Sequence, residues 1–212
     1  MHLPDFLKDK YNEWKLNKFP KISNLLNELE IKGQNPKAMI ISCCDSRVNP
    51  NIIFKGNEGD YFIHRNIANL VPPSDTGSLH YATSSAIEYA VSSLKISDLI
   101  ILGHSNCGGI KYAYECFVAN KQKDNSSIYN WIKNIRPAYM KLNKNVDKQN
   151  DLHNLEKLSI QNSISNLHSF PNIKNLILNK KLNVYGLWFE IKSGNLMVFN
   201  NEENKFDNVN QL

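Results

Sequence analysis

Two short polar clusters carry the residues that could do chemistry in this chain. The first is segment 43–47 (Cys-Cys-Asp-Ser-Arg), and the second is segment 104–109 (His-Ser-Asn-Cys-Gly-Gly). Each follows an apolar run, 38–41 and 99–102, that is typical of a buried strand in a parallel sheet. Ligands of open α/β sheets bind at the carboxyl ends of such strands. Because Cys thiolates and His nitrogens are favoured zinc ligands, we predict that the two clusters share one metal ion.

Three side chains of these clusters are the predicted metal ligands. His104 and Cys107 are three residues apart across a strand-to-helix turn, and Cys43 would supply a third ligand from the neighbouring strand. The fourth position could be filled by Asp45, by Cys44 or by water. Water there would make the site catalytic, because catalytic zinc sites keep one position open whereas structural sites close it.

Arg47 favours water as the fourth ligand. A guanidinium beside Asp45 would hold that group as a carboxylate and engage both of its oxygens in a bidentate pair. A carboxylate engaged in this way is less available to the metal, and its remaining lone pairs can orient a zinc-bound hydroxide. Zinc lowers the pKa of bound water from 15.7 toward roughly 7. Because two thiolates donate more charge than imidazoles do, the pKa of the bound water should be somewhat higher here. Gly108 and Gly109 form either a loose turn or a pair of backbone donors for an oxyanion.

The remaining cysteines and histidines are predicted to be structural. Cys44 would point away from Cys43 on a continuing strand, and Cys116 falls in a predicted helix, where a free thiol behaves as a small apolar group. No partner pattern surrounds the other histidines, which are His2, His64, His80, His153 and His168. Among them, His80 is the one candidate for a proton shuttle.

Strands and helices alternate in the first half of the chain, which predicts an α/β fold with a central, mainly parallel sheet flanked by helices. Helical periodicity predicts a helix over 78–94, another starting near Cys107, and an amphipathic one over 151–167. The expected strands are 38–43, 60–64, 98–103, 183–191 and 196–200, the last two joined by a hairpin turn at 193–195.

The whole chain, 1–212, is interpreted as one domain. Apolar residues recur at helical spacing over 4–32, which predicts a helical arm (1–32) that could wrap a neighbouring subunit. Residues 33–212 would form the α/β core, with a helical insertion at about 120–170. The polar tail from Asn201 onward is expected to fray.

The bulk composition is that of an ordinary globular protein. Hydrophobic residues make up 42% and charged residues 21% of the chain, whose formal net charge is +5. The lysines are mixed with 20 acidic residues, so no basic stripe predicts nucleic-acid binding. No apolar stretch approaches the roughly 20 residues that span a bilayer, and the N-terminus lacks a signal-peptide pattern. We therefore expect no membrane association and a cytoplasmic location in which thiols stay reduced.

The two clusters together resemble the motifs of β-class carbonic anhydrases. The resemblance is carried by Cys-x-Asp-Ser-Arg at 43–47 and His-x-x-Cys-Gly-Gly at 104–109, and it extends to segments 62–69 and 86–90. It implies one Zn²⁺ per subunit, held by Cys43, His104 and Cys107, with the Asp45–Arg47 pair acting as described above. It also implies a homodimer, or a dimer of such dimers, with active sites at the subunit interface.

The plant-like branch of that family is the closer match. On this resemblance the substrate is contacted by Gln34, by a pocket wall, and by the backbone of Gly108; the wall residues are Phe62, Ile67 and Tyr89. A second branch has a tryptophan where this chain has Ile40, and in its closed state the aspartate binds zinc. A permanently open site is therefore expected here. Ile67 stands in place of a more familiar valine and Cys44 in place of serine, and neither change removes a catalytic group.

The sequence therefore predicts zinc-dependent, reversible hydration of carbon dioxide to bicarbonate and a proton. One alternative is a related hydrolase of small heteroallenes, such as carbon disulfide or carbonyl sulfide, with a narrower and drier access route. Another is a non-catalytic zinc or thiol-sensing module, in which a fourth protein ligand closes the site. Gln34 and the pocket residues favour carbon dioxide.

Overall fold

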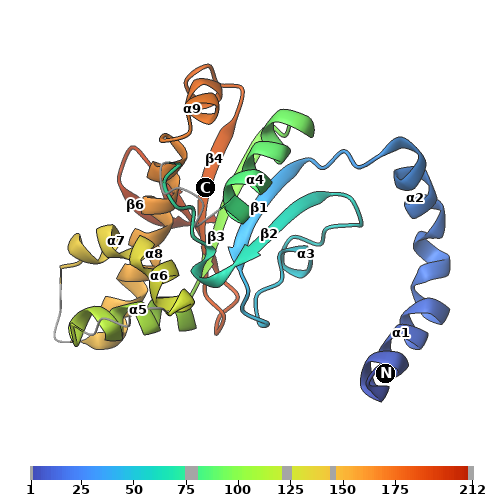
Figure 1. Cartoon of the computed structure of the whole chain (residues 1–212), viewed down its shortest axis with the longest axis horizontal. Coiled ribbons are helices and arrows are strands. Elements are labelled where there is room, and N and C mark those ends of the chain that lie inside the picture. Colours follow the sequence, from blue (N-terminus) through green and yellow to red (C-terminus); the bar gives the residue numbers. More distant parts are fainter. Residues whose placement is uncertain (1, 75–80, 121–125, 144–146, 210–212) are drawn as a thin grey trace.

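A computed structural model describes residues 2–74, 81–120, 126–143 and 147–209, and a six-stranded sheet is its central element (Figure 1). The strand order is β2-β1-β3-β4-β5-β6. The first four strands pair in parallel, whereas β5 and β6 are antiparallel to their neighbours. The predicted α/β fold with a mainly parallel sheet is thereby confirmed. The strands are β1 (Ala38–Cys43), β2 (Tyr61–Asn66), β3 (Asp98–His104), β4 (Asn183–Phe189), β5 (Leu196–Asn200) and β6 (Lys205–Asn208).

Helices surround this sheet. The longest, α8 (Lys148–Leu167), packs on β3 and β4. The predicted helix over 78–94 is seen as α4 (Tyr81–Glu88) followed by the π-helical turn η3 (Tyr89–Ser93), while His80 lies outside the described residues. The other helices are α1 (Asp5–Asn17), α2 (Phe19–Lys32), α3 (Pro50–Ile53), α5 (Gly108–Val118), α6 (Ser127–Ile132), α7 (Arg136–Met140) and α9 (Pro171–Leu178), with short 3₁₀ turns η1 (Ile67–Asn69) and η4 (Lys133–Ile135).

The composition of β1 suits a strand in the interior of the sheet. All six of its residues are buried, because the strand has neighbours on both edges and packed side chains on both faces. Ile40 packs with Leu102 and Leu187 on one face, and Ile41 packs with Ile101 on the other. A continuous apolar run, rather than an alternating one, is typical of such a doubly covered parallel strand.

The N-terminal arm extends away from the sheet (Figure 1). Neither α1 nor α2 buries a residue, and Phe6, Leu16 and Ile31 are 67%, 76% and 84% exposed. Large apolar side chains in such numbers on one segment are typical of an interaction surface. Lys18 forms an ion pair of 2.6 Å with Glu58, which ties the arm to the core.

The predicted fraying of the tail is wrong for Lys205–Asn208. These residues form β6, which pairs antiparallel with β5, and Phe206 packs against Phe199 with ring centroids 5.3 Å apart. An edge strand has solvent on one side, so a segment of mostly polar residues can form it once one aromatic side chain anchors it. None of the described helices is long and apolar enough to cross a membrane.

Candidate metal centre and active site

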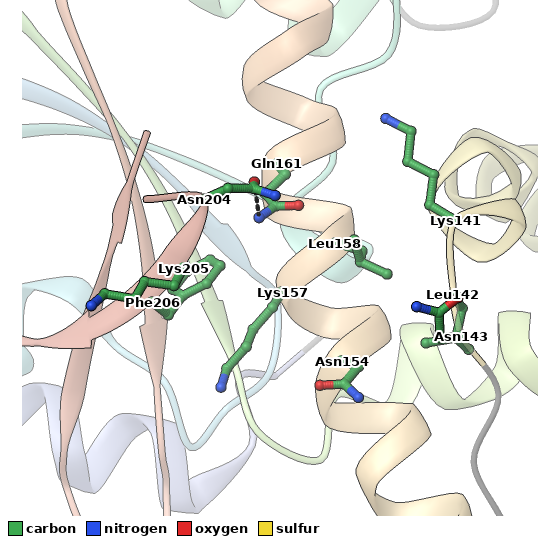
Figure 2. Close-up of a pocket in the computed structure, with 10 residues that line it drawn as sticks. All are labelled: Lys141, Leu142, Asn143, Asn154, Lys157, Leu158, Gln161, Asn204, Lys205 and Phe206. Carbon is green, nitrogen blue, oxygen red and sulfur yellow. Dashed lines mark hydrogen bonds between the residues drawn. The ribbon is translucent and has the colours of Figure 1, made fainter. Parts of the chain in front are cut away.

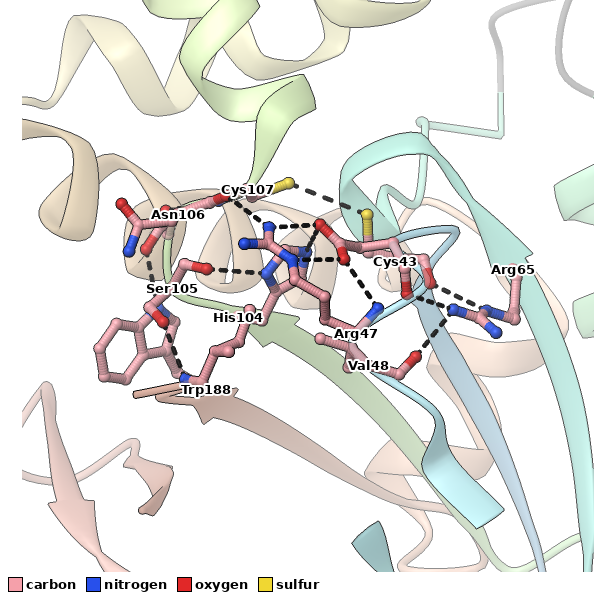
Figure 3. A network of polar contacts seen from close by, with 12 residues as sticks. Cys43, Arg47, Val48, Arg65, His104, Ser105, Asn106, Cys107 and Trp188 are labelled. Carbon is pink, nitrogen blue, oxygen red and sulfur yellow. Dashed lines mark hydrogen bonds and ion pairs between the residues drawn. The ribbon is translucent and has the colours of Figure 1, made fainter. Parts of the chain in front are cut away.

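The three predicted metal ligands meet at one edge of the sheet. β1 and β3 are parallel neighbours in which Ser42 pairs with Leu102, so Cys43 and His104 leave the sheet at the same edge. Cys107 follows as the N-cap of α5. All three side chains are buried, and their ligand atoms lie within 4.8 Å of one another. The Sγ atoms of Cys43 and Cys107 are 3.9 Å apart (Figure 3).

The donor set of this cluster fits a zinc ion. Nδ1 of His104 lies 2.9 Å from the carbonyl oxygen of Ser105 and therefore carries the proton that it donates. Nε2 of His104 is buried and makes no hydrogen bond within the described part of the chain. A buried, unpartnered nitrogen is costly unless a ligand occupies its lone pair. One imidazole nitrogen and two sulfurs are the donors that zinc favours.

The two thiols of the cluster are close enough to hydrogen-bond. This hydrogen bond lowers the pKa of Cys43 and, together with burial, raises the pKa of Cys107 well above its ordinary value. Loss of the second proton is therefore favoured when a metal cation binds beside the sulfurs. Metal binding at this site is expected to release protons and to weaken in acid.

Asp45 faces the ligand cluster but is held by Arg47. The Arg47 Nε and Nη2 atoms donate to Oδ1 and Oδ2 of Asp45 at 2.9 and 2.7 Å, and the Arg47 backbone N–H donates to Oδ1 at 3.0 Å. The guanidinium hydrogen bond holds the pKa of the Asp45 carboxyl well below its usual range. Oδ2 lies 3.8 Å from Nε2 of His104. The carboxylate is thus next to the metal ligands while both of its oxygens are engaged elsewhere.

Arg65 fixes the backbone that carries this pair. It projects from β2 and donates to the carbonyl oxygens of Cys43, Asp45 and Val48 at 2.9, 2.8 and 2.7 Å. A guanidinium with five N–H donors can hold three carbonyls at once (Figure 3). These three hydrogen bonds anchor the segment that follows β1 to strand β2.

Glu156 holds the other side of the cluster. This carboxylate of α8 is only 3% exposed, and it accepts hydrogen bonds of 3.0 Å from the Cys107 backbone N–H and from Nε1 of Trp188. Burial raises its pKa to about 7. A helix thus supplies a buried acceptor to the ligand-bearing turn, which is how neighbouring groups orient metal ligands in other sites.

The predicted substrate-binding residues fall into two groups. Ile67 directly follows Asn66, which pairs with Cys43, and its carbonyl oxygen accepts a hydrogen bond of 2.7 Å from Nε1 of Trp131. Gly108 opens α5 beside Cys107, and a Cβ added there would meet nothing within 4 Å. Both residues lie at the metal-binding edge of the sheet.

The second group lies toward the opposite end of the sheet. Phe62 pairs with Met39, four residues before Cys43, which places it about 13 Å away along the strands. The Tyr89 ring packs on Phe62 with centroids 5.8 Å apart, and Gln34 precedes β1 in an exposed position. One chain therefore does not bring Gln34, Phe62 and Tyr89 to its own metal ligands.

Two hollows bear on where substrate could approach. One of about 440 Å³ lies beside the cluster and is mainly apolar; it is lined by Cys44, His64, Ile67 and Trp131 among others. Another of about 550 Å³ crosses the outer face of α8 between Lys141 and Phe206 (Figure 2), and none of its lining residues belongs to the metal cluster. No metal ligand lines the first hollow either, but its wall includes Cys44 and Asn66, which follow and pair with Cys43, so it is the nearer of the two to the ligands.

Cys44 and Cys116 take the places predicted for them. Cys44 is exposed on the wall of the smaller hollow and is not part of the ligand cluster, and Cys116 is buried in α5.

Sequence reasoning missed the residues that support the cluster, which are Arg65, Glu156, Trp188, Asn106 and Gln149. One signal was available: Glu156 falls on the apolar stripe of its helix, between Leu155 and Ile160, where a charged residue needs a partner.

Comparison with known proteins places these features in a family. The sequence profile described as "Carbonic anhydrase" matches residues 38–196. The Arabidopsis thaliana protein "Beta carbonic anhydrase 3" is 32% identical over 191 residues, which cover 89% of this chain and 73% of that protein.

Solved structures agree with this assignment. The β-carbonic anhydrase CcaA superposes with a TM-score of 0.87 at 26% identity, over 96% of this chain and 91% of that one. A tetrameric β-carbonic anhydrase from the filamentous ascomycete Sordaria macrospora gives a TM-score of 0.78 at 28% identity, over 92% and 95% of the two chains. The profile covers well over half of the sequence, and the metal cluster lies inside it. The chain therefore belongs to the β-class carbonic anhydrase family.

Proposed function

We propose that this chain binds one zinc ion through Cys43, His104 and Cys107 and uses it to hydrate carbon dioxide reversibly. The observation that carries the proposal is the unpartnered Nε2 of His104, which faces two thiols beside a carboxylate that an arginine holds back. Family membership supports hydration over the other reactions considered above.

The residues of the chain have separate tasks in this reaction. Zinc in the cluster would supply the Lewis acid that makes water nucleophilic near neutral pH. Asp45 stays ionised because Arg47 lowers its pKa, so it can accept a hydrogen bond from the nucleophile and orient it. Ile67 supplies an apolar wall, and the backbone N–H of Gly108, at the start of α5, can donate to a substrate oxygen. The engaged Asp45 and the buried Ile40 support a site that stays open.

Metal content and carbon dioxide turnover test this function together. We expect one zinc per chain by elemental analysis, and stopped-flow hydration with a pH indicator that is lost on chelation and restored by zinc. The Cys43→Ser variant should lose both metal and activity, whereas Cys116→Ser should keep both. Hydration that survives complete chelation would contradict the proposal. Turnover of carbon disulfide or carbonyl sulfide without carbon dioxide hydration would favour the heteroallene hydrolase instead.

We further propose that the active site is completed by a second copy of the chain. Gln34, Phe62 and Tyr89 lie too far from their own metal ligands to contact a substrate there, and no residue of α1 or α2 in the apolar N-terminal arm is fully buried in its own chain. A dimer in which each chain supplies these residues to the other would account for both observations. The Sordaria macrospora relative is a tetramer, and this supports the assembly of two such dimers.

Mixed dimers test whether Gln34 contributes to the active site of the partner chain or to that of its own chain. Two differently tagged chains, Gln34→Leu and Cys43→Ser, are co-expressed and the mixed species is purified by both tags. If Gln34 acts across the interface, one of the two sites is complete, and about half of the wild-type activity per dimer should return. Mixed dimers no more active than the two parent variants would show that Gln34 acts within its own chain.

A cytoplasmic location stays part of this proposal. Two of the predicted ligands are thiols that must remain reduced to bind metal, and all four cysteines are free in the structure. Reducing compartments are where such sites persist without oxidation.

A further inference from the structure

The guanidinium of Arg47 is held from two sides. One is the Asp45 carboxylate; the other is the backbone carbonyl oxygen of Asn106, which accepts from the same Nη2 atom at 3.2 Å. Because the Arg47 side chain is 52% exposed, packing alone does not fix its position. The placement of the Asn106 carbonyl therefore helps to decide whether the guanidinium stays on Asp45.

Asn106 is itself in an unusual backbone conformation. It lies between the ligands His104 and Cys107 with a φ of 55°, in the left-handed region. Asparagine tolerates this region better than most residues, yet the conformation still needs support from its surroundings. That support comes from the Asn106 side chain, whose Oδ1 accepts a hydrogen bond of 3.0 Å from Nε2 of Gln149.

Gln149 is well placed to give this support. It lies in the first turn of α8, where its backbone N–H is capped by the Asp147 carboxylate at 2.9 Å. The second proton of Nε2 points to Nε2 of His153, one turn further along the helix, at 2.8 Å. His153 in turn packs edge-on against Trp188, with ring centroids 5.5 Å apart. The carboxamide is thus held in one orientation, with one proton for each acceptor.

One face of α8 therefore reaches both ends of the ligand-bearing turn. Gln149, His153 and Glu156 are four and three residues apart, which places them on the same side of a helix. Glu156 holds the Cys107 N–H, while Gln149 holds the side chain of Asn106. We propose that Gln149 is a positioning residue, which acts through Asn106 to keep the Arg47 guanidinium on Asp45 and so keeps that carboxylate off the metal.

This inference rests on the proposed zinc site. It predicts that Gln149→Leu has the same effects as Arg47→Ala, but smaller ones. In Gln149→Leu, Asn106 loses its side-chain support, and Asp45 should spend part of its time as a metal ligand. We expect kcat for carbon dioxide hydration to fall about three- to tenfold, the rate equivalent of one hydrogen bond. The cobalt-substituted protein should show a visible absorption spectrum displaced part of the way toward that of Arg47→Ala. A merely structural role would lower thermal stability and leave that spectrum unchanged.

Gln161→Leu is the matched control. It makes the same substitution on the same helix, where the Gln161 side chain donates to Oδ1 of Asn204 at 3.5 Å (Figure 2) and is not part of the ligand cluster. Asn106→Gly provides a second test, because glycine adopts a positive φ freely but lacks the side chain that Gln149 holds. Adding Gln149→Leu to Asn106→Gly should then have no further effect on kcat or on the cobalt spectrum.

Two results would overturn the role assigned to Gln149: a Gln149→Leu spectrum and kcat equal to those of the Gln161→Leu control, or full additivity with Asn106→Gly. If the wild-type protein binds cobalt but does not hydrate carbon dioxide, the proposed function fails while the spectral comparison still tests Gln149.

Discussion

Arg47→Ala is expected to lose carbon dioxide hydration by a factor on the order of 100 while still binding zinc. Without the guanidinium, Oδ2 of Asp45 loses its donor and Oδ1 keeps only the backbone N–H of residue 47, so the carboxylate can turn toward the metal-binding cluster, where it lies 3.8 Å from Nε2 of His104. Stopped-flow hydration and elemental analysis of the same preparation measure the two quantities.

Two further variants separate this effect from a general loss of charge. Arg47→Lys keeps a cation but not the two-pronged donor, so its activity should lie between those of the wild type and Arg47→Ala. Arg136→Ala removes an arginine whose guanidinium lies over the Phe117 ring, and it should leave hydration unchanged. Full turnover in Arg47→Ala would refute the role given to the Asp45–Arg47 pair, and loss of zinc would assign Arg47 to metal binding instead.

Glu156→Gln is expected to remove a pH dependence of stability from the metal-free protein. Burial raises the pKa of Glu156 to about 7 from an ordinary 4.5, so between these values the folded state binds more protons than the unfolded one. The free energy of unfolding must then fall as pH rises through this window and become level above it. The difference corresponds to about 3 kcal/mol as an upper bound. Urea denaturation of chelator-treated protein from pH 4.5 to 8 measures the slope.

The comparison of slopes isolates Glu156 from other titrating groups. His64 and His153 have pKa values lowered by burial, which gives a slope of opposite sign in both the variant and the wild type. Glu115→Gln, which changes an exposed glutamate paired with Lys148, is the control and should keep the wild-type slope. Equal slopes in wild type and Glu156→Gln would mean that Glu156 does not change its protonation on folding.

The elements that position the metal ligands could be predicted from sequence because their signals are local. The run 38–43 is apolar except for Ser42, and its prediction as a buried strand matches β1 residue for residue. The third strand was predicted one residue short, so His104 closes β3 rather than following it. In both cases the polar cluster begins where the apolar run ends, so the residue types and the strand pattern indicated the same position for the site.

The supporting residues could not be predicted because their roles depend on contacts between distant segments. Glu156 is 49 residues from Cys107, and Gln149 is 43 residues from Asn106. Nothing in the spacing of α8 shows which turn of the chain its polar side chains will meet. The β6 strand was missed for a related reason, because its polar residues become a strand only when the edge of β5 is available to them.

The location of the predicted ligands at the ends of β1 and β3, two neighbouring interior strands, also bears on how zinc binding and folding would be coupled. Cys43 and His104 end strands that are paired on both sides and mostly buried, and such core strands are typically among the last parts of a domain to open. We therefore expect the core to form the ligand geometry before any ion binds, unlike a zinc finger, whose fold needs its metal. Zinc would then stabilise this protein by mass action, in proportion to the logarithm of its free concentration relative to its dissociation constant. Its release would leave a folded chain ready to bind another ion.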